Sequence, residues 1–186
     1  TIGGTVACNL SGPRRFSAGA ARDHLLGVTA VSARGEIFKA GGRVVKNVTG
    51  YDLCKLLAGS YGTIAVMTHL SLKALPAPEG VRTVLLYDLP LNAAWDAMKR
   101  ALASHLDVSG AAYLPRKIAS RLAVPGLADA PVVALRLEGT ARSVADRCDA
   151  LRTLMGECRV DALHSLDSSA LWRKIRDVAP YVSDER

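Results

Sequence analysis

The sequence predicts an α+β fold made of two modules, and three observations support this fold class. Apolar and polar residues alternate from Thr63 to Leu75, as in a strand with one buried face. The proline-rich segment over residues 76–80 then ends this pattern. After it, extended and helical patterns follow in the order β-α-β-β-α-β. We therefore expect one module over residues 1–79 and another over residues 80–186.

The strongest signal in the first module lies over residues 46–75, KNVTGYDLCKLLAGSYGTIAVMTHLSLKAL, and predicts a polar turn, a short helix and a long strand. Gly50, Gly59 and Gly62 leave the backbone free for positive φ or for close approach by a ligand. Tyr51 or Asp52 can add polar contacts at the start of the helix. A phosphate or a flavin fits such a segment, and so does an ordinary loop between helix and strand. Strict alternation predicts one strand face with Ile64, Val66, Leu70 and Leu72, and the other with Met67, His69 and Lys73.

Two earlier stretches of the first module also carry signals. Residues 1–13, TIGGTVACNLSGP, suit a loop whose amides closely approach a ligand such as a diphosphate, although a tight loop without a ligand fits equally. Residues 25–33 are rich in β-branched side chains, Arg34-Gly35 interrupts them, and residues 36–40 resume an extended pattern. This succession predicts a β-hairpin.

The second module fits the split βαβ arrangement, also called ferredoxin-like, in which two helices cover four strands. The expected strands span residues 82–88, 108–114, 131–138 and 158–163. The first expected helix has Leu91, Trp95, Met98 and Leu102 at helical spacing, with Asn92 as its cap. The second follows Gly139-Thr140 and carries the apolar stripe Val144, Cys148, Leu151 and Met155. A final helix is expected over residues 172–178, with Ser168 or Ser169 as the cap at which it begins.

Charge, hydropathy and cysteine spacing argue against several classes of protein. The net charge of +7 is spread over separated basic pairs, and only 5% of residues are aromatic, so no nucleic-acid surface is predicted. No apolar run approaches the roughly 20 residues that span a bilayer. Cys8, Cys54, Cys148 and Cys158 form no CxxC pair, which favours reduced thiols in the cytoplasm. The start of the sequence resembles neither a signal peptide nor a natural N-terminus, so we expect a piece of a longer chain.

The sequence does not identify a catalytic residue. No GxSxG or Walker A motif occurs, which argues against hydrolases and NTPases. The four histidines, His24, His69, His105 and His164, stand alone, so we expect no metal site. Near the glycine segments, Arg14, Arg15 and Arg22 are candidates for binding an anion, and a solvated surface role is the alternative.

Taken together, five segments resemble one protein family. In chain order they are TIGG, SGPRR, LGVTAVSARGEI, KNVTGYDLCKLLAGSYGTIAVM and LSLKALPAP. They are similar to the second half of the FAD-binding domain of the vanillyl-alcohol-oxidase/PCMH family, and within it to the E-subunit type of bacterial glycolate oxidases. The resemblance covers residues 1–78. It implies an FAD-dependent oxidoreductase whose first subdomain would precede Thr1, and a cap domain, here incomplete at its C-terminus, after the FAD domain.

The resemblance also implies which residues contact FAD. Those against the pyrophosphate are Thr1, Ile2, Gly3 and Gly4, and those running towards the isoalloxazine ring are Ala7, Ser11 and Gly12. A third group lines the cofactor, with backbone groups near the strand serving the adenosine end: Gly59, Ser60, Gly62, Thr63, Ile64 and Val66.

By the same resemblance, the parent protein belongs to a complex that oxidises glycolate, a small 2-hydroxy acid, to glyoxylate. Its partners would be a flavin-containing D subunit and an iron–sulfur F subunit, in the cytoplasm or peripheral at the inner membrane through the complex. Two alternatives stay open. One is another FAD-linked oxidase or dehydrogenase of the superfamily, and the other is a non-catalytic interaction subunit that has lost flavin. The fragment alone is expected to be inactive and to self-associate.

The break at residues 76–80 generates a first prediction. Limited proteolysis is expected to cut near Pro76 to Gly80, because an exposed linker between two cores is the most accessible backbone. Mass spectrometry of the early fragments locates the cut. Cleavage inside Thr63 to Leu75, with none near the break, would contradict the predicted boundary.

Overall fold

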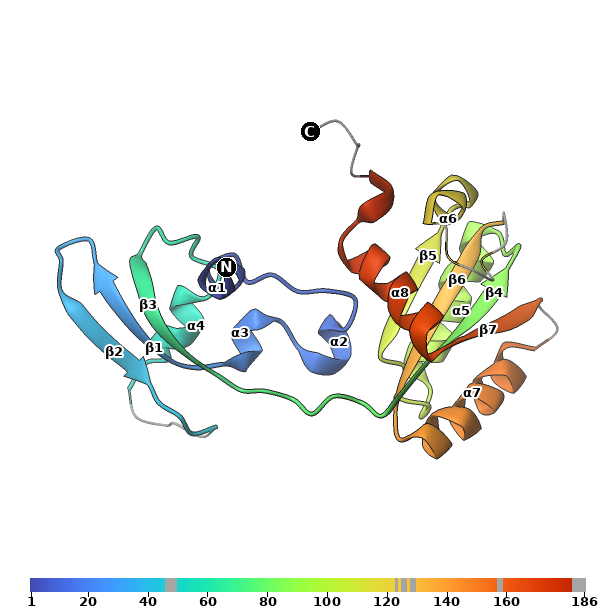
Figure 1. Ribbon diagram of the computed structural model, residues 1–186, viewed down its shortest axis with the longest axis horizontal. Helices are drawn as coiled ribbons and strands as arrows, with labels where there is room; N and C mark the ends of the chain where they lie inside the picture. Colours follow the sequence, from blue (N-terminus) through green and yellow to red (C-terminus); the bar gives the residue numbers. More distant parts are fainter. Residues whose placement is uncertain (46–49, 123, 125–126, 128–129, 157–158, 182–186) are drawn as a thin grey trace. The chain divides into compact units, whose positions relative to one another are not determined.

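The computed structural model describes residues 1–45, 50–122, 124, 127, 130–156 and 159–181 (Figure 1). The chain divides into two compact units, Thr1–Pro76 and Ala77–Arg186. The division lies at the start of the proline-rich segment. No helix in the described ranges is both long and apolar enough to cross a membrane.

The first unit is built on a three-stranded antiparallel sheet. Its elements are α1 (Ile2–Ala7), α2 (Arg15–Ala18), α3 (Ala21–His24), β1 (Leu25–Ser32), β2 (Ile37–Gly41), α4 (Leu53–Leu57) and β3 (Ala65–Leu72). β1 lies in the middle and pairs with β2 on one side and β3 on the other. The predicted hairpin is confirmed. In its turn Gly35, at φ 79°, donates its N–H to the Ser32 carbonyl at 3.0 Å.

One face of this sheet forms the core of the unit. Val6 of α1 and Leu57 of α4 are 2% and 1% exposed and belong to the same apolar cluster as strand residues. The other buried members are Leu25, Val28, Ala30, Cys54, Ala58 and Ala65, with Phe38, Met67 and Leu70 packed against them. The first helix is therefore held to the sheet by apolar contacts.

The predicted loop over residues 1–13 is wrong for its first half, because residues 2–7 form α1. Thr1 is the N-cap, and its Oγ1 accepts a hydrogen bond from the N–H of Gly4 at 3.1 Å. The threonine hydroxyl accepts a hydrogen bond from an N–H group of the first turn, for which the helix has no carbonyl partner of its own. Each glycine costs a helix about 1 kcal/mol relative to alanine. Burial of Val6 stabilises the helix despite that cost.

The predicted strict alternation of β3 is also wrong. The strand begins at Ala65, and its register with β1 skips Thr68, which is the signature of a β-bulge. One extra residue exchanges the two faces of a strand. The core side therefore carries Ala65 and Met67 before the bulge and Leu70 after it. Val66 points to the other face and is 64% exposed, so Val66 and Leu70 do not share a face.

The second unit contains a four-stranded sheet in the order β5-β6-β4-β7, with every neighbouring pair antiparallel. Its elements are β4 (Gly80–Tyr87), α5 (Leu91–Ala103), β5 (Gly110–Leu114), α6 (Arg116–Leu122), β6 (Val132–Gly139), α7 (Ala141–Met155), β7 (Val160–His164), α8 (Ser165–Arg176) and a 3-10 turn, η1 (Ala179–Tyr181). Four strands were predicted near these positions, but α6 was not predicted. Residue 158, the expected start of the last strand, lies outside the described residues.

Helices cover both faces of this sheet (Figure 1). Val84 and Leu86 of β4 face α5 and α7, whereas Leu85 and Tyr87 face α6 and α8. The apolar stripe predicted for α7, Val144, Cys148, Leu151 and Met155, is buried as expected. The two helices predicted between the strands, α5 and α7, cover one face, and α6 and α8 cover the other, because both faces of β4 and β6 are apolar.

Helix α5 is present as predicted, but its small residues pack against the sheet. Its buried residues are Ala94, Ala97 and Ala101. The large apolar residues whose spacing predicted the helix are mostly exposed: Leu91 66%, Trp95 59% and Leu102 45%. Alanine side chains let a helix lie close to a sheet, and they recur at the same helical spacing as the larger residues. The N-cap is Pro90, so the predicted cap Asn92 lies within the helix.

Helix α8 begins at Ser165, before both serines that were predicted to cap it. Ser168 lies inside the helix and is fully buried, with its Oγ 2.7 Å from Oγ1 of Thr83 on β4. Trp172 donates its Nε1–H to the same threonine oxygen at 2.8 Å. These contacts join α8 to the centre of the sheet through polar groups that are satisfied within the core.

Replacing Thr83 by valine tests this network. Valine keeps the shape but leaves the Trp172 N–H buried without an acceptor, so Thr83→Val should lower the free energy of unfolding by about 1–3 kcal/mol. Urea unfolding followed by tryptophan fluorescence measures the change. Thr153→Val is the matched control, since the Thr153 hydroxyl is exposed on α7 and bonds only the Asp149 carbonyl in its own helix. Equal effects of the two substitutions would contradict a special role for Thr83.

Candidate functional site

The candidate site begins where α1 meets the loop between α4 and β3. Gly59 donates its N–H to the Val6 carbonyl at 3.1 Å, and Tyr61 donates its N–H to the Ala7 carbonyl at 2.8 Å. Two main-chain hydrogen bonds therefore join segments that are more than fifty residues apart in the sequence. The structure thus brings together two of the segments whose residues were predicted to contact FAD.

The predicted residues occupy four places. Thr1 caps α1, and Ile2, Gly3, Gly4 and Ala7 lie within it. Ser11 and Gly12 lie between α1 and α2, the residues from Gly59 to Ile64 lie between α4 and β3, and Val66 lies in β3. Because Val66 points away from the sheet face that α1 covers, its side chain does not join the others. Its strand is an edge of the described sheet, which leaves backbone groups on one side without a strand partner.

The loop from Gly59 to Ile64 has two features that point to a missing contact. The Oγ of Ser60 is buried but has no hydrogen-bond partner among the described residues. An orphaned buried hydroxyl is uncommon, because it loses its bonds to water without replacement. Tyr61 adopts φ 54°, a region that bulky side chains rarely occupy. Such outliers concentrate at ligand sites.

Apolar side chains near this junction are exposed. The exposed set is Ile2, Leu10, Tyr61 and Ile64. Gly3 has open space where a side chain would start, since no atom lies within 4 Å of the position that a Cβ would take there. The surface therefore combines apolar area with a glycine that lets another group approach the backbone.

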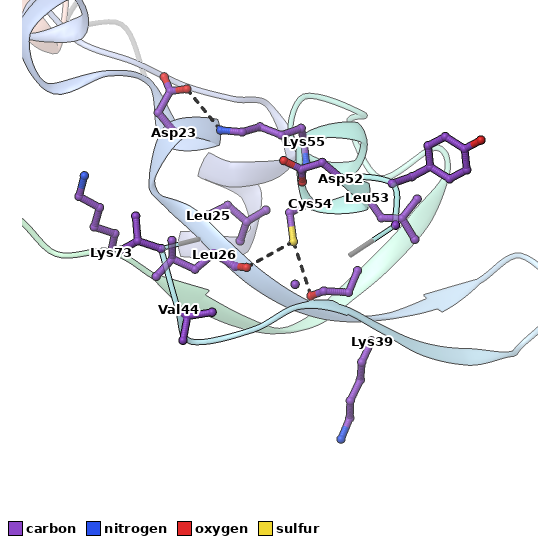
Figure 2. Close-up of a pocket in the computed structure, with 15 residues that line it drawn as sticks. Asp23, Leu25, Leu26, Lys39, Val44, Asp52, Leu53, Cys54, Lys55 and Lys73 are labelled. Atoms are coloured by element: carbon purple, nitrogen blue, oxygen red, sulfur yellow. Dashed lines mark hydrogen bonds and ion pairs between the residues drawn. The ribbon is translucent and has the colours of Figure 1, made fainter. Parts of the chain in front are cut away.

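A separate cavity of about 450 Å³ lies beside the first residues of α4 (Figure 2). Gly50, Tyr51 and Asp52, the residues singled out for polar contacts, line it, but none of the predicted FAD contacts does. Asp52 serves mainly as the N-cap of α4, since it accepts the N–H of Lys55 at 3.0 Å. Residues 46–49, which begin the predicted cradle, lie outside the described residues.

Two charged groups at this cavity, Asp23 and Lys55, are engaged locally. Lys55 lies 3.5 Å from the Asp23 carboxylate and donates to the Arg22 carbonyl at 3.0 Å. The N–H of Ala20, at 2.8 Å, and the nearby lysine lower the pKa of Asp23. Figure 2 shows Lys39 extending away from the cavity wall. We infer from these contacts that the charges fix α3 against α4.

Cys54 lies in the cavity wall but has a structural environment. Its Sγ lies 3.7 Å from the Leu26 carbonyl and 3.5 Å from the Ala40 carbonyl (Figure 2). Burial raises the pKa of this thiol. Because the thiolate is the reactive form, the environment disfavours nucleophilic chemistry at Cys54.

The histidines show no metal-binding arrangement. No three His, Cys, Asp or Glu side chains gather closely enough to hold a metal in the parts of the chain that the structure describes. His24 lies between two carbonyls, with Nδ1 3.0 Å from Lys73 O and Nε2 2.8 Å from Ala18 O. It thereby ties the start of β1 to the end of β3. Sequence reasoning missed this role, because the two carbonyls lie in different segments.

No family model matches the chain. Among curated proteins, it is 39% identical over 122 residues to the glycolate oxidase subunit GlcE of Escherichia coli, covering 66% of this chain and 35% of that subunit. It is 36% identical over 106 residues to the subunit GlcD of Bacillus subtilis, covering 57% and 23% respectively. A D-lactate dehydrogenase of Anaerostipes hadrus is 42% identical over 86 residues, covering 46% and 18%.

Among solved structures, alkyldihydroxyacetonephosphate synthase matches with a TM-score of 0.74 at 16% identity. The match covers 98% of this chain and 36% of that chain, and it shows that the two share a mixed helix and sheet fold. The chain spans about a third of the length of GlcE. A Mycobacterium tuberculosis protein named as an FAD-linked oxidoreductase is 39% identical over 106 residues, covering 57% of this chain and 23% of that protein. On sequence, the chain is thus a relative of the glycolate oxidase subunits and of FAD-linked oxidoreductases, which confirms the resemblance drawn from its glycine segments.

Proposed function

We propose that this chain is part of the FAD-binding subunit of a glycolate oxidase or dehydrogenase, which oxidises glycolate to glyoxylate. The observation that carries the proposal is the 39% identity to GlcE over 122 residues. In this chain, main-chain hydrogen bonds also join two of the glycine-containing segments. The first unit would be the second subdomain of a PCMH-type FAD domain. The second unit, with its sheet order β5-β6-β4-β7, would be a ferredoxin-like cap.

The proposed FAD contacts are the residues around the α1 junction. The Ser60 hydroxyl has no partner in the described structure and could donate to a cofactor oxygen or nitrogen. Exposed Ile64 and Tyr61 offer apolar surface that would shield a ring system from water. Thr1, Gly3 and Gly4 belong to the pyrophosphate side, and Ser11 and Gly12 to the isoalloxazine side. Val66 would contribute through the backbone of an edge strand.

Bound flavin supplies the electron acceptor for oxidation of a 2-hydroxy acid. Within this subunit, the described residues of the chain bind and orient the cofactor. No general base is assigned to them, because His24 is held between two carbonyls and His69 contacts Thr68. Catalytic groups would therefore come from other parts of the subunit or from its partners.

The proposed partners follow from the subunit names of the relatives. GlcE and GlcD are both named as glycolate oxidase subunits. We propose a complex with a flavin-containing D subunit and an iron–sulfur F subunit, located in the cytoplasm or held peripherally at the inner membrane.

A different 2-hydroxy acid is the second candidate substrate. The similarity to D-lactate dehydrogenase supports it, because both substrates carry a hydroxyl beside a carboxylate. Reduction of a dye by the purified complex with glycolate or with D-lactate distinguishes the two. A parent protein that binds no flavin would instead favour the non-catalytic interaction subunit.

The proposed site predicts that residues 1–186 bind FAD weakly and that the full-length parent binds it tightly. The reason is that the chain spans only about a third of the length of GlcE, so we propose a site that is completed by residues outside this chain. Fluorescence titration of FAD into both proteins measures the difference. Submicromolar, stoichiometric binding by the 186-residue chain would show that it builds a complete site and would overturn the shared-site account.

In the parent, Ser60→Ala should weaken FAD binding about fivefold, since one hydrogen bond from a buried hydroxyl contributes about 1 kcal/mol. Ser120→Ala is the matched control, because its hydroxyl is exposed on α6 and bonds only the Lys117 carbonyl. An unchanged affinity for Ser60→Ala would remove this serine from the site.

A further inference from the structure

The ring of His24 lies where three segments of the first unit meet. Its Nδ1 is 3.0 Å from the Lys73 carbonyl oxygen, and its Nε2 is 2.8 Å from the Ala18 carbonyl oxygen. Ala18 ends α2, His24 ends α3, and Lys73 directly follows β3. The N–H of Lys73 also donates to the His24 carbonyl at 2.8 Å. We call the two ring contacts, to Ala18 and to Lys73, the His24 bridge.

The two oxygens of the His24 bridge determine which form of the ring fits between them. A main-chain carbonyl accepts hydrogen bonds and cannot donate one. A neutral imidazole carries a single N–H, so it donates to one oxygen and turns a bare nitrogen toward the other. The imidazolium carries an N–H on each nitrogen and satisfies both oxygens. The complete bridge therefore requires the protonated ring, and loss of the proton breaks one of its two bonds.

The groups around the ring are charged, but the carboxylates among them are engaged elsewhere. Asp23 accepts the Ala20 N–H at 2.8 Å and lies 3.5 Å from Lys55, and Asp52 caps α4. Helix α1, which also packs on α3, carries no charged side chain. The ionisable groups on the other neighbouring segments and on α3 itself are Arg14, Arg15, Arg22, Asp23, Asp52, Cys54, Lys55 and Lys73. The two carbonyls are thus the acceptors that distinguish the two forms of the ring.

The His24 bridge acts on the proposed cofactor surface through α2. The residues proposed for the isoalloxazine side, at positions 11 and 12, lie between α1 and α2. Before them, Asn9 accepts the Arg22 N–H on its Oδ1 at 2.9 Å. After them, the Ala18 carbonyl is held by the ring of His24. The segment is therefore fastened to α3 at both ends, and one of the two fastenings depends on a proton.

We propose that His24 is a positioning residue of the FAD site, and that its protonated ring holds the segment from α1 to the end of α2 in place for the cofactor. The inference rests on the proposed function, because that function assigns this segment to FAD. The complete bridge is present while the ring is charged and is lost as rising pH removes the proton to water. FAD affinity should therefore decrease as the pH rises through the titration of His24.

Nuclear magnetic resonance of the 186-residue chain with nitrogen-15-labelled histidine tests the bridge without any FAD. When the His24 ring is charged, both of its N–H protons should be visible, because hydrogen bonds to carbonyls slow their exchange with water. When the ring is neutral, one should remain. The signals are assigned by their absence from His24→Gln. A charged ring on which only one N–H proton, or neither, is visible would overturn the proposal.

Titration of FAD into the full-length parent between about pH 5 and 8, where histidine changes its charge, tests the coupling to the cofactor. Loss of the proton should weaken binding about fivefold, the effect of one hydrogen bond, at the same midpoint as the ring signals. His24→Gln keeps N–H donors but does not titrate, so it should remove this pH dependence. His69→Gln is the matched control and should retain it, because His69 is exposed on β3 and contacts the neighbouring Thr68.

The unmodified parent provides the pH profile by itself, and circular dichroism checks that both variants are folded. An FAD affinity that stays constant while the ring titrates, or a pH dependence that survives in His24→Gln, would overturn the positioning role. A parent that binds no FAD at any pH would overturn the proposed function and the positioning role together. The ring signals of the 186-residue chain would still show whether the His24 bridge exists, which separates the two failures.

Discussion

The junction between α1 and the loop before β3 is the constraint on which the candidate site depends. Two main-chain hydrogen bonds, from Gly59 to Val6 and from Tyr61 to Ala7, fix the loop against the helix. Burial of Val6 holds the same helix on the sheet. The glycine segments can therefore act together only when the sheet has formed, because the bonds that join them and the apolar contacts of Val6 link residues that are distant in the sequence.

Three features of the candidate site indicate that a contact is missing. The buried Ser60 hydroxyl and the positive φ of Tyr61 are both costly in isolation. The exposed apolar residues beside them are the third sign. A bound flavin and an adjoining subdomain would account for all three features. The 450 Å³ cavity beside α4 has a different character, since Asp23 and Lys55 in its wall are paired with each other and Asp52 caps a helix.

Which residues of α5 are exposed on the second unit depends on which side of the helix packs against the sheet. Three alanines permit close packing, and the larger residues are displaced outward. Both faces of the sheet are covered by other apolar residues of the unit. The exposed tryptophan of α5 is thus not needed for the core.

The sequence by itself determined the hairpin, the buried stripe of α7 and the relation to FAD-linked oxidoreductases, because each depends on local spacing or on a continuous motif. It placed α1 in a loop and Leu70 on the face of Val66, and the helical spacing around Trp95 did not determine which side of α5 faces the core. In each case only tertiary contacts decided the outcome. Val6 stabilises a glycine-containing helix, the bulge at Thr68 exchanges the faces of β3, and the sheet selects alanines over larger side chains. At these three places the local pattern is compatible with two structures. Packing against residues that are distant in the sequence determines which of the two forms.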